Sequence, residues 1–111
     1  MINVNDLKNL LSLKLLAGEK GLPKKVMDCY IGDLLSWVMA KAKSGDIWLT
    51  VMGNINAIAV ASLKDMAVII LCEDSHLDKD AKDKADEEGI TVLQSDKNSF
   101  QLACIIKELI Q

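Results

Sequence analysis

Side chains with nucleophilic or metal-binding chemistry are few and widely spaced in this chain. The cysteines are Cys29, Cys72 and Cys104, and the only histidine is His76. A disulfide framework uses an even number of cysteines in a secreted chain, and a zinc site usually contains a closely spaced C-x-x-C pair. Each cysteine lies in an apolar stretch, where a free thiol behaves as a small hydrophobic side chain. We therefore expect buried free cysteines, a solvated histidine, and no metal site or cofactor.

Catalysis by a thiol needs a base in contact with it and a third group that orients the base. Cys72, His76 and Asp96 are the set that could serve a hydrolase or phosphotransferase. Their spacing does not enforce contact between nucleophile and base. The chain also lacks G-x-x-x-x-G-K-[ST] and G-x-G-x-x-G, the loops that hold nucleotide phosphates in kinases and dehydrogenases. The sequence predicts no catalytic residues, and a hydrolase or phosphotransferase that uses Cys72, His76 and Asp96 is the least favoured hypothesis.

Hydroxyl, amide and carboxylate groups that could contact a ligand follow two expected strands. Thr50, Asn54 and Asn56 lie in one segment after an apolar run, and Asp33 opens a helix-like stretch. Such groups beside helix N-termini suit an anion or a nucleotide phosphate. Helix capping by itself also places Ser, Asp and Asn at these points, so Asp33 is expected to be an N-cap first and a ligand contact second. The other three are the best ligand candidates, because their loop has no strong helix signal of its own.

The positions of these residues depend on segments that alternate between strand and helix patterns. Apolar, β-prone runs bounded by turn residues predict strands at residues 14–17, 25–30, 47–52, 66–72 and 90–93. Apolar spacings of three and four residues predict helices from Asn3 or Asn5 to 11, from Asp33 to 42, at 57–63, at 78–88 and from Asn98 to 110. A strand is the alternative at 57–63, since that segment contains β-branched residues. Asn98 and Gln101 resemble a capping box.

Strands and helices that alternate at spacings of about 20 residues imply right-handed β-α-β crossovers. We therefore expect an α/β fold, a small three-layer sandwich with a mostly parallel sheet of about five strands, whose order the sequence does not predict. In such a sheet the loops at the carboxyl ends of the strands meet at one edge, where ligands bind. This edge would bring together Asp33, the segment from Thr50 to Asn56, and the loops at 72–76 and 95–99.

The segment 78–88 predicts a helix whose outer face is solvated and held by charge pairs four residues apart, such as Asp78 with Lys82 and Asp80 with Lys84. With 50% hydrophobic residues, the domain could still keep one apolar patch for a second copy. The large side chains expected in the core are Trp37, Met39 and Trp48.

Composition sets the outer limits of these hypotheses. The chain has 111 residues and a formal net charge of −3, which fits one domain over residues 1–111 and disfavours disorder. A nucleic-acid partner is not expected, because it would require a basic face. A membrane is not expected either, because no apolar run approaches the roughly 20 residues of a membrane span. The first residues lack the pattern of a secretory signal, so we expect a cytoplasmic protein.

Several stretches together resemble the DRTGG domain, from about Leu15 to the C-terminus. They are the segments at 30–40, 46–50, 57–61, 85–90 and 99–103. The resemblance implies an α/β fold similar to the N-terminal domain of HPr kinase/phosphorylase, without the kinase domain of that enzyme. DRTGG domains occur beside CBS domains in regulatory regions and as short separate proteins. The family is associated with ligand sensing and dimer contacts, and no catalytic activity is established for it.

The chain departs from the family where the name-giving motif should fall, at residues 23–29. Pro23 and Lys24 replace the acidic residue and the arginine, and Met27, Asp28 and Cys29 replace the threonine and the two glycines. Asn54 occupies the position at which the short separate proteins of the DRTGG family often have a histidine.

The leading hypothesis is a non-catalytic regulatory module that forms a homodimer and binds a small ligand or a partner protein. The alternative is a sensor of an anionic metabolite or nucleotide, with Thr50, Asn54, Asn56 and Asp33 as contacts.

Overall fold

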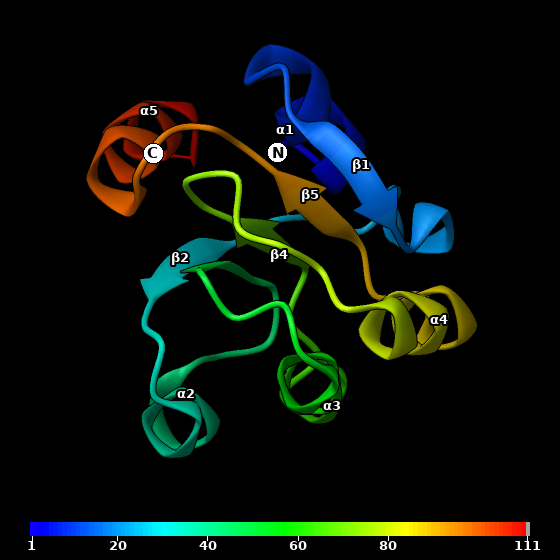
Figure 1. Cartoon of the computed structure of the whole chain (residues 1–111). Helices are drawn as coiled ribbons and strands as arrows, with labels where there is room; N and C mark the ends of the chain where they lie inside the picture. Colours follow the sequence, from blue (N-terminus) through cyan, green and yellow to red (C-terminus); the bar gives the residue numbers. More distant parts are fainter. Residues whose placement is uncertain (111) are drawn as a thin grey trace.

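The computed structural model describes residues 1–110, which form five strands in one sheet and five α-helices. The sheet has the order β1-β5-β4-β3-β2 (Figure 1). Strands β2 to β5 are parallel to their neighbours, and β1 joins β5 in the antiparallel direction. The strands are β1 (Lys14–Ala17), β2 (Asp28–Ile31), β3 (Asp46–Thr50), β4 (Val68–Leu71) and β5 (Val92–Gln94).

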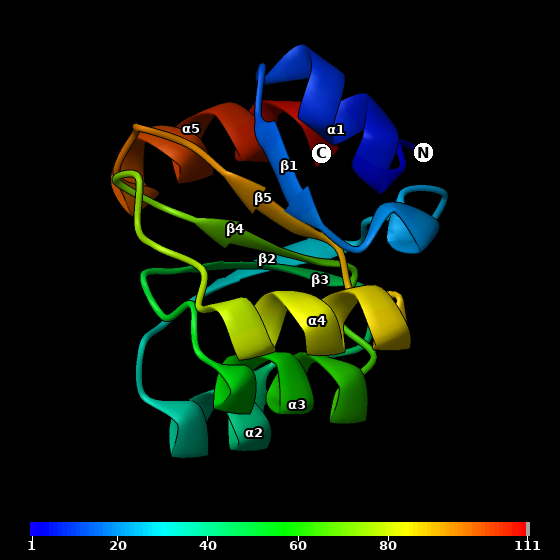
Figure 2. The same ribbon diagram turned by 45° about the vertical axis from the view of Figure 1, so that its right-hand side comes forward.

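The helices lie on both faces of this sheet, so the predicted three-layer α/β sandwich is confirmed. Figure 2 shows α2, α3 and α4 on one face and α1 and α5 on the other. The segment at 57–63 is helical, as favoured, and the 3-10 turn at Glu19–Gly21 was not predicted. The α-helices are α1 (Val4–Leu10), α2 (Leu35–Lys41), α3 (Ile55–Leu63), α4 (Lys79–Glu88) and α5 (Ser99–Ile110).

Two apolar cores fill the spaces between the layers. Alternate side chains of one strand point to opposite faces of a sheet, so Trp48 of β3 packs toward α2 and α3 while Ile47 and Leu49 pack toward α1 and α5. Every residue of β3 and β4 is buried. Strands covered on both faces have continuous apolar sequences, and this pattern predicts both strands from the sequence.

Local capping explains where several helices begin and end. Asn3 begins α1 with a reciprocal capping box to Asp6. The predicted capping box of α5 is confirmed, because Gln101 N–H donates to Asn98 Oδ1 at 2.9 Å and Asn98 N–H donates to Gln101 Oε1 at 3.0 Å. Gly89 ends α4 in the left-handed conformation, at a φ of 69°.

The predicted charge pairs of α4 are wrong, although the charged outer face is correct. The observed pairs are Lys82 with Asp86, at 3.0 Å between Nζ and Oδ2, and Lys84 with Glu88, at 3.6 Å between Nζ and Oε1. Asp78 lies before the helix, and its carboxylate is 3.9 Å from the ring of His76. Asp80 accepts a hydrogen bond from the backbone N–H of Ala81. Both carboxylates therefore contact groups other than the predicted lysines.

Not every residue expected inside is buried. Trp48 and Cys72 are buried as predicted, but Trp37 is 59% exposed and Met39 is also exposed. The core side of α2 is formed by Leu35, Val38 and Ala42. Trp37 and Met39 lie on either side of this stripe and therefore point away from the core. Cys104 is exposed and Cys29 is half-buried, so the expectation for these two thiols is wrong. Cys29 lies on the edge strand β2, and Cys104 lies on α5 outside the buried positions of that helix.

Candidate functional site

The carboxyl ends of the four parallel strands form one edge of the sheet, as predicted, and hydrogen bonds join the loops there. The loop after β3 reaches the loop after β4, because Asp78 N–H donates to the carbonyl of Gly53 at 2.8 Å. The loop after β4 reaches the loop after β5, where Asp74 N–H donates to the carbonyl of Ser95 at 2.8 Å. The edge is a connected set of loops, and the candidate residues lie within it.

Asp33 connects the loop after β2 to the end of β3. Its Oδ1 accepts a hydrogen bond from Thr50 Oγ1 at 2.6 Å and from Val51 N–H at 3.0 Å. Asp33 is therefore not the N-cap of α2. That position belongs to Leu34, whose side chain makes no capping bond. The prediction failed because β2 and β3 are neighbours in the sheet, which brings Thr50 and Val51, distant in sequence, within hydrogen-bond distance of Asp33.

Thr50 and Asn54 also have structural partners. Thr50 is 2% exposed, and its Oγ1 accepts a hydrogen bond from Met52 N–H at 3.2 Å besides donating to Asp33. Asn54 is the N-cap of α3, because its Oδ1 accepts from Ala57 N–H at 3.0 Å. The segment thus has a helix signal that the sequence interpretation missed. Asn56 lies in the first turn of α3 with an exposed side chain.

Close backbone contact holds the same edge together at Gly53. A Cβ atom at this position would overlap the carbonyl oxygen of His76. The loops after β3 and β4 can approach each other only because residue 53 has no side chain. This part of the edge is packed backbone against backbone, with little space for a ligand.

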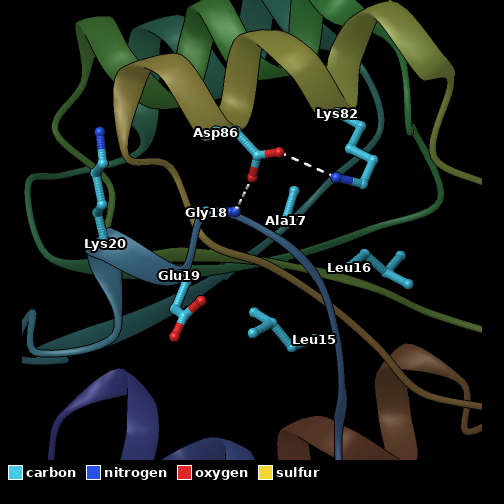
Figure 3. A pocket seen from close by; sticks show the side chains of 8 residues that line it. All are labelled: Leu15, Leu16, Ala17, Gly18, Glu19, Lys20, Lys82 and Asp86. Carbon is cyan, nitrogen blue, oxygen red and sulfur yellow. Dashed lines mark hydrogen bonds and ion pairs between the residues drawn. The ribbon is translucent and has the colours of Figure 1, made fainter.

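Cavities lie away from this packed part of the edge. One, of about 640 Å³, lies where the end of β1 faces α4 (Figure 3). Asp86 crosses it, accepting from Gly18 N–H at 2.7 Å and from Lys82 Nζ at 3.0 Å. These two donors, the Gly18 amide first, lower the pKa of Asp86. The group is thus an internal brace between β1 and α4.

A smaller cavity, of about 320 Å³, lies over the carboxyl end of β5, with Lys14, Asp74 and Lys97 among its lining residues. Its charges are mixed, since two lysines face the carboxylates of Asp74 and Asp96. None of the four candidate residues lines either this cavity or the larger one.

Two of the three thiols, Cys29 and Cys72, are poorly suited to nucleophilic catalysis. Burial raises the pKa of Cys72 to about 11 and that of Cys29 to about 12. A nucleophilic cysteine needs a lowered pKa, because the thiolate is the reacting form. The side chain of His76 is 84% exposed and lies 3.9 Å from Asp78. Among residues 1–110, no group of three or more His, Cys, Asp or Glu side chains could hold a metal ion.

Large apolar side chains are exposed at several separate places, and the sequence predicted an apolar patch without placing it. Leu34 and Trp37 of the α2 region are 60% and 59% exposed, whereas the exposed Ile31 of the edge strand β2 lines a cavity with residues of α5 on the other face of the sheet. A signal was present, because large apolar residues in the segment 34–39 occupy more than one face of the helix. No helix among residues 1–110 is long and apolar enough to cross a membrane.

Comparisons with known proteins place this fold in a family. The model of the DRTGG domain matches residues 6–109. No curated protein matches the chain. A crystal structure of the CBS and DRTGG domains of the regulatory region of Clostridium perfringens pyrophosphatase, complexed with the activator diadenosine tetraphosphate, is similar with a TM-score of 0.71. The identity is 16%, and the match covers 94% of this chain and 45% of that chain. This chain therefore belongs to the DRTGG domain family, as its sequence predicted, and has the fold of a module found in the regulatory region of an enzyme.

Proposed function

We propose that this DRTGG domain is a non-catalytic regulatory module that acts by association, as a homodimer, and performs no reaction. One observation carries the proposal: the outer side of α2 exposes two large apolar side chains, Leu34 and Trp37. Exposed aromatic side chains of this size are typical of protein interfaces. A domain of this kind transmits a signal through its contacts.

The polar residues at the carboxyl edge support the same conclusion. Asp33, Thr50 and Asn54 hold loops and a helix end in place, and burial keeps the Cys72 thiol protonated at neutral pH. These groups serve the fold instead of a reaction. The similar DRTGG domain of the pyrophosphatase belongs to a regulatory region, which agrees with this role. This chain matches less than half of that structure, so control of an enzyme remains part of the proposal.

Sedimentation velocity over protein concentrations from micromolar to several hundred micromolar tests the association. We expect a reversible shift from monomer to dimer within this range. A monomer at every concentration would contradict the proposal.

A second candidate function is the binding of an anionic metabolite or nucleotide at the carboxyl edge. The observation in its favour is Asn56, which is exposed in the first turn of α3, beside Asn54, Thr50 and Asp33. The similar structure was obtained with diadenosine tetraphosphate, which makes that compound the first ligand to test. Against it, the carboxylate of Asp33 lies at the same edge and would repel an anion.

Thermal unfolding with and without millimolar diadenosine tetraphosphate, ATP or pyrophosphate decides this candidate. Binding to the folded state raises the melting temperature with ligand concentration. Asn56→Ala should reduce that increase, and Asn9→Ala on α1 serves as the control. An unchanged melting temperature with all three compounds would contradict nucleotide binding.

The cytoplasmic location, the single domain over residues 1–111 and the likeness to HPr kinase/phosphorylase stay predictions.

A further inference from the structure

We propose that the open edge of β2 is the dimer contact, and that two copies pair their β2 strands antiparallel about a two-fold axis at Tyr30. The five-stranded sheet of one molecule then continues into the sheet of a second copy. This inference rests on the proposed function, because it names the surface through which the module associates.

The first support is that the edge at β2 is regular. The sheet has two edge strands, β1 and β2. The register of β1 with β5 shifts between Leu15 and Ala17, whereas β2 stays in register with β3 over all four of its residues. A regular edge strand presents a row of unpaired N–H and C=O groups to which another strand can bind. Of the two edges, that of β2 is therefore the better template for pairing.

The second support is the direction of the backbone groups of β2. Gly32, directly after β2, donates its N–H to the carbonyl of Leu49 in β3 at 3.3 Å. Successive residues of a strand direct their backbone groups to alternate sides, so Tyr30 also faces β3, whereas Cys29 and Ile31 face the open edge. Among residues 1–110, no loop or side chain accepts a hydrogen bond from the Ile31 N–H.

The carboxylate of Asp28 occupies part of this edge in the monomer. Its Oδ1 accepts a hydrogen bond from the Cys29 N–H at 2.8 Å, which agrees with the outward direction of that group. A charged side chain on an edge strand limits its pairing with other strands. In the dimer, the carbonyl of Ile31 in the second copy replaces this carboxylate. Asp28 thus competes with association and keeps it reversible.

The third support is that the edge matches itself. A two-fold axis perpendicular to the sheet sets two copies of β2 antiparallel, with the same face of each sheet on the same side. With the axis at Tyr30, Cys29 of each copy lies opposite Ile31 of the other. Such a pair exchanges both of its N–H···O bonds, and these are the two residues whose backbone groups face outward. The half-exposed Ile31 side chain then packs beside Cys29 of the second copy, because both side chains lie on the α5 face.

The fourth support concerns size. Four paired residues extend only about 13 Å, and a stable interface buries about 800 Å² on each partner. Both layers beside the edge add area. A groove of about 580 Å³ lies between β2 and α5, lined by Met27, Ile31 and Ile106 among others. On the other face, α2 lies beneath β2 (Figure 1) and exposes Leu34 and Trp37. The molecule measures 33 by 26 by 24 Å, so a contact over this whole side is of the required size.

Ile31→Pro tests the pairing of the strands, with Ile31→Val as the matched control. Proline is tolerated on an edge strand where its nitrogen faces solvent, so the variant removes the outward N–H and leaves the bonds to β3 intact. By sedimentation velocity we expect the dimer Kd of Ile31→Pro to rise at least about 30-fold and that of Ile31→Val to stay within about threefold. Circular dichroism spectra should match the wild-type spectrum. Ile31→Lys, a charge on the edge, is the second variant should Ile31→Pro fail to fold.

Asp28→Ala tests the competition at the same edge and has the opposite expected sign. It frees the Cys29 N–H and removes the edge charge, so the dimer Kd should fall at least about threefold, a gain that a damaged fold would not produce. Asp83→Ala removes an exposed carboxylate from α4 and should leave the Kd unchanged.

Hydrogen exchange of the wild type reads the pairing directly. The Ile31 amide should exchange more slowly as the protein concentration rises from about 5 to about 500 micromolar, because it becomes hydrogen-bonded only in the dimer.

The outcomes separate this inference from the proposed function. A dimer that persists in Ile31→Pro or Ile31→Lys, or an Ile31 amide whose exchange does not slow in the dimer, would overturn the edge contact and leave self-association standing. A Kd that rises in Asp28→Ala would also contradict the edge contact. A wild-type monomer at all concentrations would overturn both the contact and the proposed function.

Discussion

Two helices on the same face of the sheet, α4 and α2, have outer surfaces of opposite chemical character: that of α4 is charged and that of α2 is apolar. In α4 the buried residues are Ala81 and Ala85, and eight of its ten residues are charged. In α2 the buried residue is Val38, and Lys41 is the one charged residue of the seven. The outer face of α4 presents charged side chains to water, whereas the outer face of α2 presents the apolar side chains of Leu34 and Trp37. The comparison shows that the outer face of α4 is suited to water, whereas that of α2 leaves large apolar side chains exposed.

The inner faces of the two helices also differ in how close they come to their neighbours. Small residues let α4 approach α3 and β1, and Asp86 then reaches the backbone of Gly18. Larger residues hold α2 against the core through Leu35 and Val38. The stability of α4 thus depends on close packing and on one polar brace, whereas that of α2 depends on apolar burial.

The largest effect is expected where the close packing of α4 is broken. Ala85→Asp would place an unpaired carboxylate at a fully buried position, at a cost of about 3 kcal/mol or more. Urea denaturation should show most of the native stability lost. Glu87→Ala, on the exposed face, should change the unfolding free energy by less than about 0.5 kcal/mol. Similar midpoints for both variants would mean that α4 is not packed as described.

A second effect concerns the apolar surface of α2 and depends on protein concentration. If folded molecules associate through α2, each tenfold rise in concentration above the dimer Kd adds about 1.4 kcal/mol to the unfolding free energy of the dimer. Urea midpoints at 5 and at 200 micromolar protein should therefore differ for the wild type and coincide for Trp37→Glu. The same dependence in both proteins would contradict the contact at α2.

A third, smaller effect concerns the brace of α4 and its pH dependence. Asp86→Asn should cost about 1 kcal/mol at neutral pH, because a charged acceptor of two hydrogen bonds is replaced by a neutral one at a partly exposed site. The pKa of Asp86 is lowered from its ordinary 3.8 in the folded state, so its contribution is present above that value and is lost as the pH falls through the folded pKa.

The stability contribution of Asp46 has the opposite pH dependence. Burial raises the pKa of Asp46, so protonation of this residue favours the folded form. The two variants Asp86→Asn and Asp46→Asn separate these contributions. In chemical denaturation at pH 7 and at pH 3, the gap between wild type and Asp86→Asn should narrow in acid. A constant gap would show that the carboxylate charge is not what holds Gly18.

The smallest effect is expected from the outer charges of α4. Lys84→Ala removes the exposed pair with Glu88 and should reduce the unfolding free energy by less than about 0.5 kcal/mol. The difference should vanish in 1 M salt, because such pairs are screened. A decrease of more than about 1 kcal/mol in the unfolding free energy that persists in salt would mean that the charged side chains of α4 stabilise the fold directly, beyond keeping this face solvated.

The sequence by itself determined the types of the main elements and the layered α/β class. Buried runs such as 68–71 and the capping pair of Asn98 and Gln101 act over short distances along the chain, so their local pattern is sufficient. The family was also readable, because the matching stretches extend along most of the chain. The carboxyl edge followed from the alternation of strands and helices.

Only the tertiary structure decided what the candidate residues do. Asp33 binds Thr50 and Val51 because β2 and β3 are neighbours in the sheet, and strand order is not encoded in local periodicity. The exposure of Trp37 likewise depends on α2 lying at the end of its layer. A side chain's partners are set by segments that are distant in sequence, so its chemistry could be listed from the sequence but its role could not.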